Sequence, residues 1–223
     1  MPKEKSQKRR HDPELTQSLI LAAAKKEFAE KGFDGARVDQ IAAEAQVNKQ
    51  LIYYYFANKD TLFTHVLEEA YRDIRRKEAA LQLDNIPARE AILALVDFTW
   101  HYYLANPEFI RLLNSENQLK ARHLKELDTI VPINRSWQSI TESILARGQQ
   151  DGTIRAGIDA MQLNISISAL GFFYLINQST LSILYQQDLR QKEALDQRLT
   201  VMREMIDCWL APKGNNTAAI TRS

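Results

Sequence analysis

The stretch that most constrains the fold is the run from Arg37 to Lys59, RVDQIAAEAQVNKQLIYYYFANK. Apolar residues recur in its first part at i, i+3, i+4 and i+7, the stripe of a short helix packed on a core: Val38, Ile41, Ala42 and Ala45. Asn48 is suited to cap a second helix through its side-chain oxygen. Because a turn this short forces two helices into a sharp angle, we predict a DNA-reading helix-turn-helix motif over about residues 37–56.

The predicted second helix separates an inner from an outer side. Ile52 and Phe56 lie four residues apart and are expected to face the core. The outward-facing residues are expected to be Lys49, Gln50, Tyr54 and either Tyr53 or Tyr55. Asn58 and Asp60 mark the start of the next helix, with Asn58 as its cap and Asp60 near its positive end.

The residues around this motif resemble the DNA-binding domain of TetR-family transcriptional regulators. The resemblance spans Leu15 to Leu67 without gaps and is carried by IAAEAQVNKQLIYYYFANKDTLF and by the residues that precede it: Ile20, Ala23, Ala24, Phe28, Gly32 and Phe33. Arg37 departs from the family pattern, which usually has Ser or Thr there. Gln46 stands where the turn usually has Gly, so it must accept a backbone conformation that Gly tolerates better.

The resemblance also implies how double-stranded DNA would be read. Lys49 and Gln50 would point into the major groove, while Tyr54, Lys59 and Arg37 would bond phosphates. The full set of expected DNA-binding residues is Arg37, Lys49, Gln50, Leu51, Tyr53, Tyr54, Tyr55 and Lys59.

Composition favours an all-α chain in which DNA binding is local. The 223 residues are 45% apolar and include only 7 Gly and 6 Pro, which suits helices around a sizeable core. The net charge of +1 requires any DNA contact to use a local patch. A single cysteine allows no intramolecular disulfide and predicts a cytoplasmic location.

We expect two folded domains between two irregular ends. Residues 1–12 form a basic stretch without the apolar segment of a signal peptide, either a flexible arm that contacts DNA or a solvated end. The DNA-binding domain is expected over 13–75, an effector-binding and dimerisation domain over 76–211, and a disordered tail over 212–223. The basic run 72–77 near the boundary is expected to be a solvated face, with DNA contact as the alternative.

Further helices are expected in the second domain, which together form a bundle able to enclose a cavity. Their predicted spans are 88–105, 108 to about 126 with a possible kink near 114–118, 131–148, and one or more helices between Asp159 and Asp188. No charged residue lies between those two aspartates. We exclude a membrane span because polar residues from Asn164 to Ser182 interrupt this stretch, and predict a helix buried by its own domain and by a partner.

The last predicted helix carries an apolar seam with a spacing of three or four residues. The seam comprises Leu195, Leu199, Met202, Ile206 and Trp209, and we interpret it as a homodimer interface. The resembling family dimerises through two such helices of each subunit. Cys208 lies beside the seam, where it is either a packed small residue or a redox sensor.

An effector pocket is the second expectation that the resemblance raises. Aromatic and amide residues that would line it are Trp100, Tyr103, Trp137, Phe173 and Asn177; the alternative is that the aromatic ones are only core. Such a lining suits a neutral or weakly polar ligand.

No pattern in the sequence indicates catalysis. The four histidines are scattered, and phosphate loops, nucleophile elbows and metal-spaced cysteines are missing, so we predict no enzyme, no metal site and no cofactor. The predicted function is a homodimeric repressor that an unknown small molecule releases from a palindromic operator. Two alternatives remain open: an effector-independent regulator or activator of the same fold, and a helical binding protein or enzyme whose DNA-binding motif is vestigial.

Overall fold

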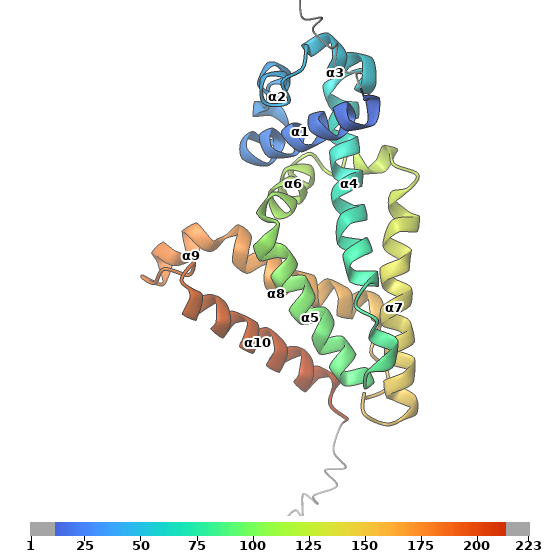
Figure 1. Cartoon of the computed structure of the whole chain (residues 1–223). Helices are drawn as coiled ribbons and strands as arrows, with labels where there is room; N and C mark the ends of the chain where they lie inside the picture. The colour runs from blue at the N-terminus through green and yellow to red at the C-terminus, as the bar shows by residue number, and fades with distance from the viewer. Residues whose placement is uncertain (1–11, 213–223) are drawn as a thin grey trace, which may run out of the picture. The chain divides into compact units, whose positions relative to one another are not determined.

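The computed structural model describes residues 12–212, which are helical without a strand (Figure 1). The predicted basic arm and tail lie outside these residues, apart from Asp12 and the first residue of the tail. The described residues divide into two compact units. The first contains residues 12–69 and 111–127, and the second contains residues 70–110 and 128–212. The structure thus divides the chain differently from the predicted boundary after residue 75.

Four helices build most of the first unit: α1 (Pro13–Gly35), α2 (Val38–Glu44), α3 (Lys49–Phe56) and the first half of α4 (Lys59–Ala79). The Asp12 carboxylate caps α1 by accepting from the backbone N of Glu14 at 3.1 Å. Gly32, at φ 68°, kinks the helix near its end. Asn58 caps α4 as predicted, because its Oδ1 accepts from Thr61 N at 2.8 Å.

The segment 111–127 completes the first unit, and the helical stretch predicted over 108 to about 126, with a possible kink near 114–118, is divided in two. Helix α6 (Pro107–Gln118) stops early and a short 3-10 helix, η2 (Leu124–Glu126), follows. The break lies at Lys120 and Ala121, which have positive φ values of 58° and 56°. Such values cannot continue a right-handed helix, so the polypeptide turns back into the unit.

The second unit packs its helices around one hydrophobic core. After the second half of α4 come η1 (Leu83–Asn85), α5 (Ala88–Ala105), α7 (Ile130–Gln150), α8 (Ala160–Ile176), α9 (Gln178–Leu184) and α10 (Lys192–Leu210). α5 lies at the centre and contacts α7, α8 and α10. Its Ile92, Leu95 and Trp100 are fully buried in the core, so the aromatic α5 is a core element.

The stretch between Asp159 and Asp188 forms two helices with a 69° bend between them. Asn177 ends α8 and precedes α9. Among the described residues, no single helix is long and apolar enough to cross a membrane, and only the bent pair α8–α9 passes that test together.

Part of the predicted dimer seam on α10 faces the core of its own unit instead. Met202 and Ile206 are 0% and 2% exposed and belong to the core of their own unit, because the apolar stripe of α10 packs on α5 and α8. Leu195, Leu199 and Trp209 are partly buried against the same core. Cys208, which the sequence favours as a packed residue, is exposed.

Candidate nucleic-acid interface

The α2–turn–α3 geometry follows from a few local bonds. Gln46 adopts the positive φ that its place in the turn requires, 54°, and Val47 N donates to Ala42 O at 3.0 Å to close the turn. The Asn48 side chain then starts α3 by accepting from Gln50 N at 2.9 Å. Ile52 and Phe56 are buried beneath α3. The inner and outer sides of this helix are therefore those that the sequence predicts.

The expected DNA-binding residues on α3 differ in how far they reach solvent. Tyr54 is 79% exposed and Gln50 is exposed beside it, whereas Leu51 and Tyr55 are half-buried. Tyr55 packs edge-on against Tyr54, with ring centroids 5.2 Å apart. Tyr53 is exposed and lies beside the Lys49 side chain, whose Nζ is 5.9 Å from its ring centroid. Gln50 and Tyr54 are consequently the most available polar groups of this helix.

Lys49, the expected base-reading cation, is held by a carboxylate of α2. Its Nζ lies 2.7 Å from Asp39 Oδ1, and both side chains are largely exposed. The hydrogen bond raises the pKa of Lys49 and lowers the pKa of Asp39. A base or phosphate would have to take the ammonium group from Asp39, which the sequence analysis did not anticipate.

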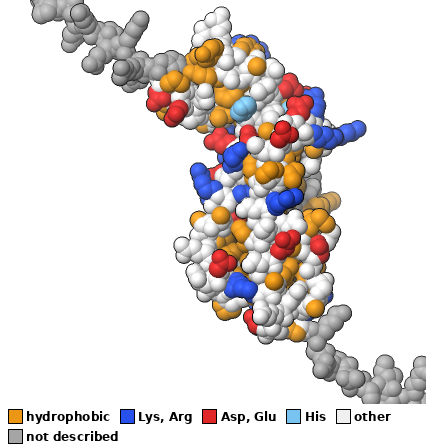
Figure 2. All heavy atoms as spheres, turned by 90° about the vertical axis from the view of Figure 1, so that its right-hand side faces the viewer, with side chains coloured by type: hydrophobic (Ala, Val, Ile, Leu, Met, Phe, Trp, Pro, Cys, Tyr) orange, Lys and Arg blue, Asp and Glu red, His pale blue; other side chains and the backbone are white. Residues whose placement is uncertain are grey.

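The two expected phosphate contacts outside α3 also have partners within the protein. Lys59 Nζ donates to the backbone oxygen of Asp34 at 3.3 Å and lies 4.8 Å from the Phe33 ring centroid. The backbone N of Arg37 donates to Glu27 Oε1 at 3.1 Å, and Arg37 itself is exposed. Figure 2 shows acidic and basic side chains interspersed over one face of the described residues.

A polar cluster around the buried Glu116 and His123 of the first unit was not predicted. Glu116, which is 2% exposed, accepts from the backbone N of His123 at 2.7 Å and of Leu124 at 3.0 Å, and His123 Nδ1 lies 2.7 Å from its other oxygen. His123 Nε2 is 3.3 Å from Asp60 Oδ1, which also accepts from Arg122 at 2.8 Å. We call the side chains of Glu116, His123, Asp60 and Arg122 the Glu116 cluster. The polar residues are visible in the sequence, but their meeting depends on the turn at 119–123.

The five residues expected to line an effector pocket do not form one site. Trp100 and Tyr103 are buried in the core, where Trp100 packs against Tyr174 with ring centroids 5.9 Å apart. Trp137 of α7 instead stacks on the Arg75 guanidinium, 3.8 Å from the ring centroid to Cζ. Phe173 is 60% exposed on another side of the unit. Asn177 Nδ2 donates to the Phe173 backbone oxygen at 2.9 Å.

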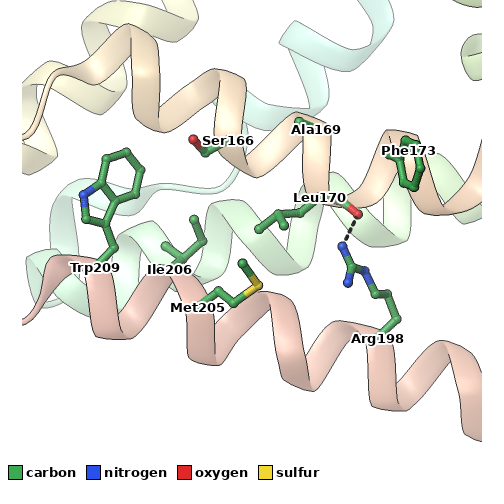
Figure 3. Close-up of a pocket in the computed structure, with 8 residues that line it drawn as sticks. All are labelled: Ser166, Ala169, Leu170, Phe173, Arg198, Met205, Ile206 and Trp209. Carbon is green, nitrogen blue, oxygen red and sulfur yellow. Dashed lines mark hydrogen bonds between the residues drawn. The ribbon is translucent and has the colours of Figure 1, made fainter.

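Phe173 belongs to an apolar groove between α8 and α10. Figure 3 shows side chains from both helices along it, and its volume is about 510 Å³. Arg198 crosses the groove and donates to Leu170 O at 2.7 Å. The lining residues are Ser166, Ala169, Leu170, Phe173, Arg198, Met205, Ile206 and Trp209. Of the predicted seam, only Ile206 and Trp209 reach this groove.

The basic run 72–77 is solvated as predicted except at Arg75. Arg76 and Lys77 are exposed and pair with Asp73 at 2.7 Å each. Arg75, by contrast, pairs with the buried Glu78 at 2.6 Å, and the two side chains are 12% and 1% exposed. Within residues 12–212, no group of three or more His, Cys, Asp or Glu side chains could hold a metal ion.

Comparisons with known proteins agree with this arrangement. Residues 20–66 match the model for bacterial regulatory proteins of the tetR family, and residues 89–206 match that of the tetracyclin repressor-like C-terminal domain. The HTH-type transcriptional repressor NicS of Pseudomonas putida is 34% identical over 197 residues, which are 88% of this chain and 93% of that protein.

Two solved structures share the fold. A bacterial regulatory protein of the tetR family from Rhodococcus superimposes with a TM-score of 0.69 at 18% identity, over 88% of this chain and 97% of that one. The transcriptional regulator FadR from Bacillus subtilis, solved in complex with stearoyl-CoA, gives a TM-score of 0.64 at 20% identity, over 86% and 98%.

Proposed function

Because this chain belongs to the tetR family of bacterial transcriptional regulators, we propose that it is a cytoplasmic repressor that binds a palindromic operator as a homodimer. A small-molecule effector bound to the second unit releases it from DNA. The observation that carries the proposal is the capped α3, which has a buried inner side and presents exposed Gln50 and Tyr54 on the other. The NicS relative is itself named a repressor.

The exposed side of α3 suits a division between base reading and phosphate binding. Gln50 has a free amide that can bond adenine edge-on, and Lys49 can donate to guanine once it leaves Asp39. Tyr54, Lys59 and Arg37 would hold the register on phosphates. In gel shifts, Gln50→Ala should relax selectivity at one operator position, whereas Lys59→Ala should weaken all sequences alike and reduce the salt slope by about one. Equal changes in selectivity would contradict the division.

The homodimer is proposed to form over the groove between α8 and α10. One helix-turn-helix covers a half-site, so specific binding needs two heads about 34–36 Å apart or a multiple of it. Phe173 and Met205, 60% and 52% exposed, stand at this groove. A second copy would bury these apolar side chains, which a solvated face would leave in water.

Two neighbouring residues of α10 give a matched test of the dimer. Met205→Asp places a charge on the exposed side and should yield folded monomers that lose operator affinity. Ile206→Asp places the charge in the core of the same unit and should unfold it. Sedimentation and circular dichroism distinguish the two outcomes. A folded Met205→Asp dimer that binds the operator normally would place the interface elsewhere.

The effector is proposed to act through α4. This uninterrupted helix runs from Lys59 to Ala79 and has residues in both compact units. The capacity of the fold to hold a ligand is supported by FadR, solved with stearoyl-CoA. Linkage requires DNA to weaken effector binding by the factor by which effector weakens DNA binding, typically about 5–150-fold.

The deciding experiment is a gel shift with a palindrome from the DNA next to the protein's own gene. Wild type should shift it, and an effector found by thermal-shift screening should release it. A dimer that binds the palindrome but responds to no ligand would support the effector-independent regulator. A folded protein that binds ligands but no palindrome would support the vestigial motif.

A further inference from the structure

The core of the second unit contains a column of polar groups between α4, α5, α7 and α8. The Arg75–Glu78 ion pair of α4 is one layer of it. Tyr103 of α5 is hydrogen-bonded to Ser168 of α8, and Thr141 Oγ1 of α7 donates to Asn164 Oδ1 of α8 at 2.8 Å. A buried ion pair is usually no more stabilising than apolar residues of the same size, so this column points to a role other than stability.

Two donors in this column have no partner. Arg75 Nε and Trp137 Nε1 are buried without a hydrogen-bond acceptor. They belong to groups in direct contact, because the guanidinium stacks on the indole ring at 3.8 Å. Glu78 satisfies only Arg75 Nη1. Buried N–H groups without an acceptor are rare in folded proteins, and two on neighbouring groups indicate a place for an acceptor that is not part of the protein.

A hollow lies about one helical turn from these donors, and neither Arg75 nor Trp137 is among the residues that line it. It has a volume of about 360 Å³ between α4 and α7 and is lined by Tyr71, Ile130, Val131, Asn134, Arg135 and Gln138. Tyr71 precedes Arg75 by four residues on α4, and Asn134 precedes Trp137 by three on α7, so the hollow lies one helical turn from the stack on both helices. A small ligand in it could place one end against Arg75 and Trp137.

We propose that the effector is a small organic acid whose carboxylate accepts from Arg75 Nε and Trp137 Nε1, while its apolar part occupies the hollow between α4 and α7. This inference rests on the proposed function and names the ligand class of that site. It replaces the neutral ligand expected from the aromatic residues alone. Arg75 is the anchor because a guanidinium matches the planar, two-oxygen geometry of a carboxylate.

Charge balance in the site is maintained by Glu78. Burial raises the pKa of the Glu78 carboxyl, so this residue can take up a proton when a second carboxylate reaches Arg75. The groups that act on Glu78 are Arg75 on its own helix and Tyr103 of α5, and burial raises the pKa of Tyr103 so that it stays neutral. Acid binding is therefore accompanied by proton uptake and strengthens as the pH falls.

Two other arginines also have an unpaired Nε, but their surroundings differ. Arg147 donates to the backbone oxygens of Leu83, Asp84 and Ile86 and thereby holds η1 in place. Arg198 donates to Leu170 O in the α8–α10 groove. Neither stacks on a group with a second unpaired donor, so the site is specific to Arg75 and Trp137.

The test compares ligands that differ only in their head group. Benzoate, benzamide and benzyl alcohol, and hexanoate with hexanamide, are titrated at up to millimolar concentration by calorimetry in two buffers of different ionisation enthalpy. Wild type should bind the acids at least about tenfold more tightly than the matched amides. Proton uptake should accompany acid binding in wild type but not in Glu78→Gln.

Conservative variants locate the contact. Arg75→Lys keeps the charge beside Glu78 but removes Nε, and Trp137→Phe keeps the stack but removes Nε1. Acid binding should fall by about tenfold or more in the first and by about fivefold in the second. The control, Arg76→Gln, removes an exposed charge on α4 next to Arg75 that does not line the hollow, and it should leave acid binding unchanged. Preference for amides, loss of binding in the control alone, or no acid binding in folded wild type would overturn the inference.

Operator gel shifts separate this inference from the proposed function. If wild type binds its palindrome and is released by compounds without a carboxylate, the ligand class is wrong and the repressor stands. If wild type binds acids through Arg75 but no palindrome, the proposed function fails while the acid site stands.

Discussion

Glu116 and Glu78 are both buried carboxylates, one in each unit, but only Glu116 has hydrogen bonds to both of its oxygens. Glu116 accepts three hydrogen bonds from a single turn of the chain. Glu78 accepts from Arg75 alone, and Arg75 Nε is left without a partner beside Trp137. Both oxygens of Glu116 accept hydrogen bonds that fix a turn. Beside Glu78, the Arg75 Nε and Trp137 Nε1 donors are left without an acceptor. Two equally buried carboxylates can therefore have different roles: Glu116 stabilises the fold, and Glu78 belongs to the proposed ligand site.

The Glu116 cluster should carry the larger share of stability. Glu116→Ala removes the acceptor of two backbone N–H groups and of His123 Nδ1, and the two donors on His123 are buried. We expect a loss of about 3–5 kcal/mol in the free energy of unfolding, as for other broken buried networks. Urea denaturation, monitored by far-ultraviolet circular dichroism, measures this loss in the free energy of unfolding.

The matched variant Glu116→Gln sharpens this result. Its single carbonyl oxygen can keep some of the bonds, so it should fall between wild type and Glu116→Ala. If Glu116→Ala lowers the free energy of unfolding by less than about 1 kcal/mol, the turn is stable without the Glu116 side chain. Glu116 would then contribute no more to stability than Glu78.

Glu78→Gln should cost less, about 1–2 kcal/mol near neutral pH, since a glutamine oxygen can still accept from Arg75. The sign of its pH dependence is fixed by the raised pKa of Glu78. The native state holds this proton more tightly than the unfolded state, so its contribution is complete below the unfolded pKa and is lost as the pH rises through the raised native pKa. Wild type should therefore gain stability over Glu78→Gln on acidification from pH 7 towards pH 5. If the free energies of unfolding of wild type and Glu78→Gln changed with pH in parallel, this expectation for Glu78 would be wrong.

The exposed Lys49–Asp39 pair is expected to contribute least to the free energy of unfolding. Both side chains are solvated, so Asp39→Asn should leave the melting temperature unchanged within error. The same change frees the Lys49 ammonium and removes a negative charge beside the proposed DNA contacts, so operator affinity should rise by a few fold in a gel shift. Asp39→Glu, which keeps the charge, should behave as wild type. A marked loss of stability in Asp39→Asn would contradict the order proposed for the three pairs.

Local chemistry explains why α3 could be predicted residue by residue. The cap at Asn48, the positive φ at Gln46 and the buried Ile52 and Phe56 each depend on residues a few positions apart. Hydrophobic spacing and capping rules describe just such short-range relations. Even here the partner of Lys49 was missed, because Asp39 belongs to the preceding helix.

The remaining features depend on contacts between distant residues. Phe33 N donates to Ser115 Oγ at 3.1 Å across 82 positions, and no periodicity announces such a bond. Helix α10 shows the same limit: its apolar spacing was real, but it could not tell whether Met202 faces its own core or a second subunit. Likewise, Arg75 looked like its solvated neighbours until Glu78 and Trp137 were placed beside it.

The discontinuous first unit has a consequence for synthesis on the ribosome. Residues 12–69 contain the DNA-reading helices, but Ser115, Glu116 and His123, which complete the unit, lie within 111–127. At about 5–20 residues per second, several seconds pass before those residues emerge. During that interval Phe33 and Phe63, which pack against His123, lack part of their cover. The nascent helix-turn-helix therefore waits for a segment encoded after the start of the second unit, and a chain cut off before residue 127 would be an early target for proteases.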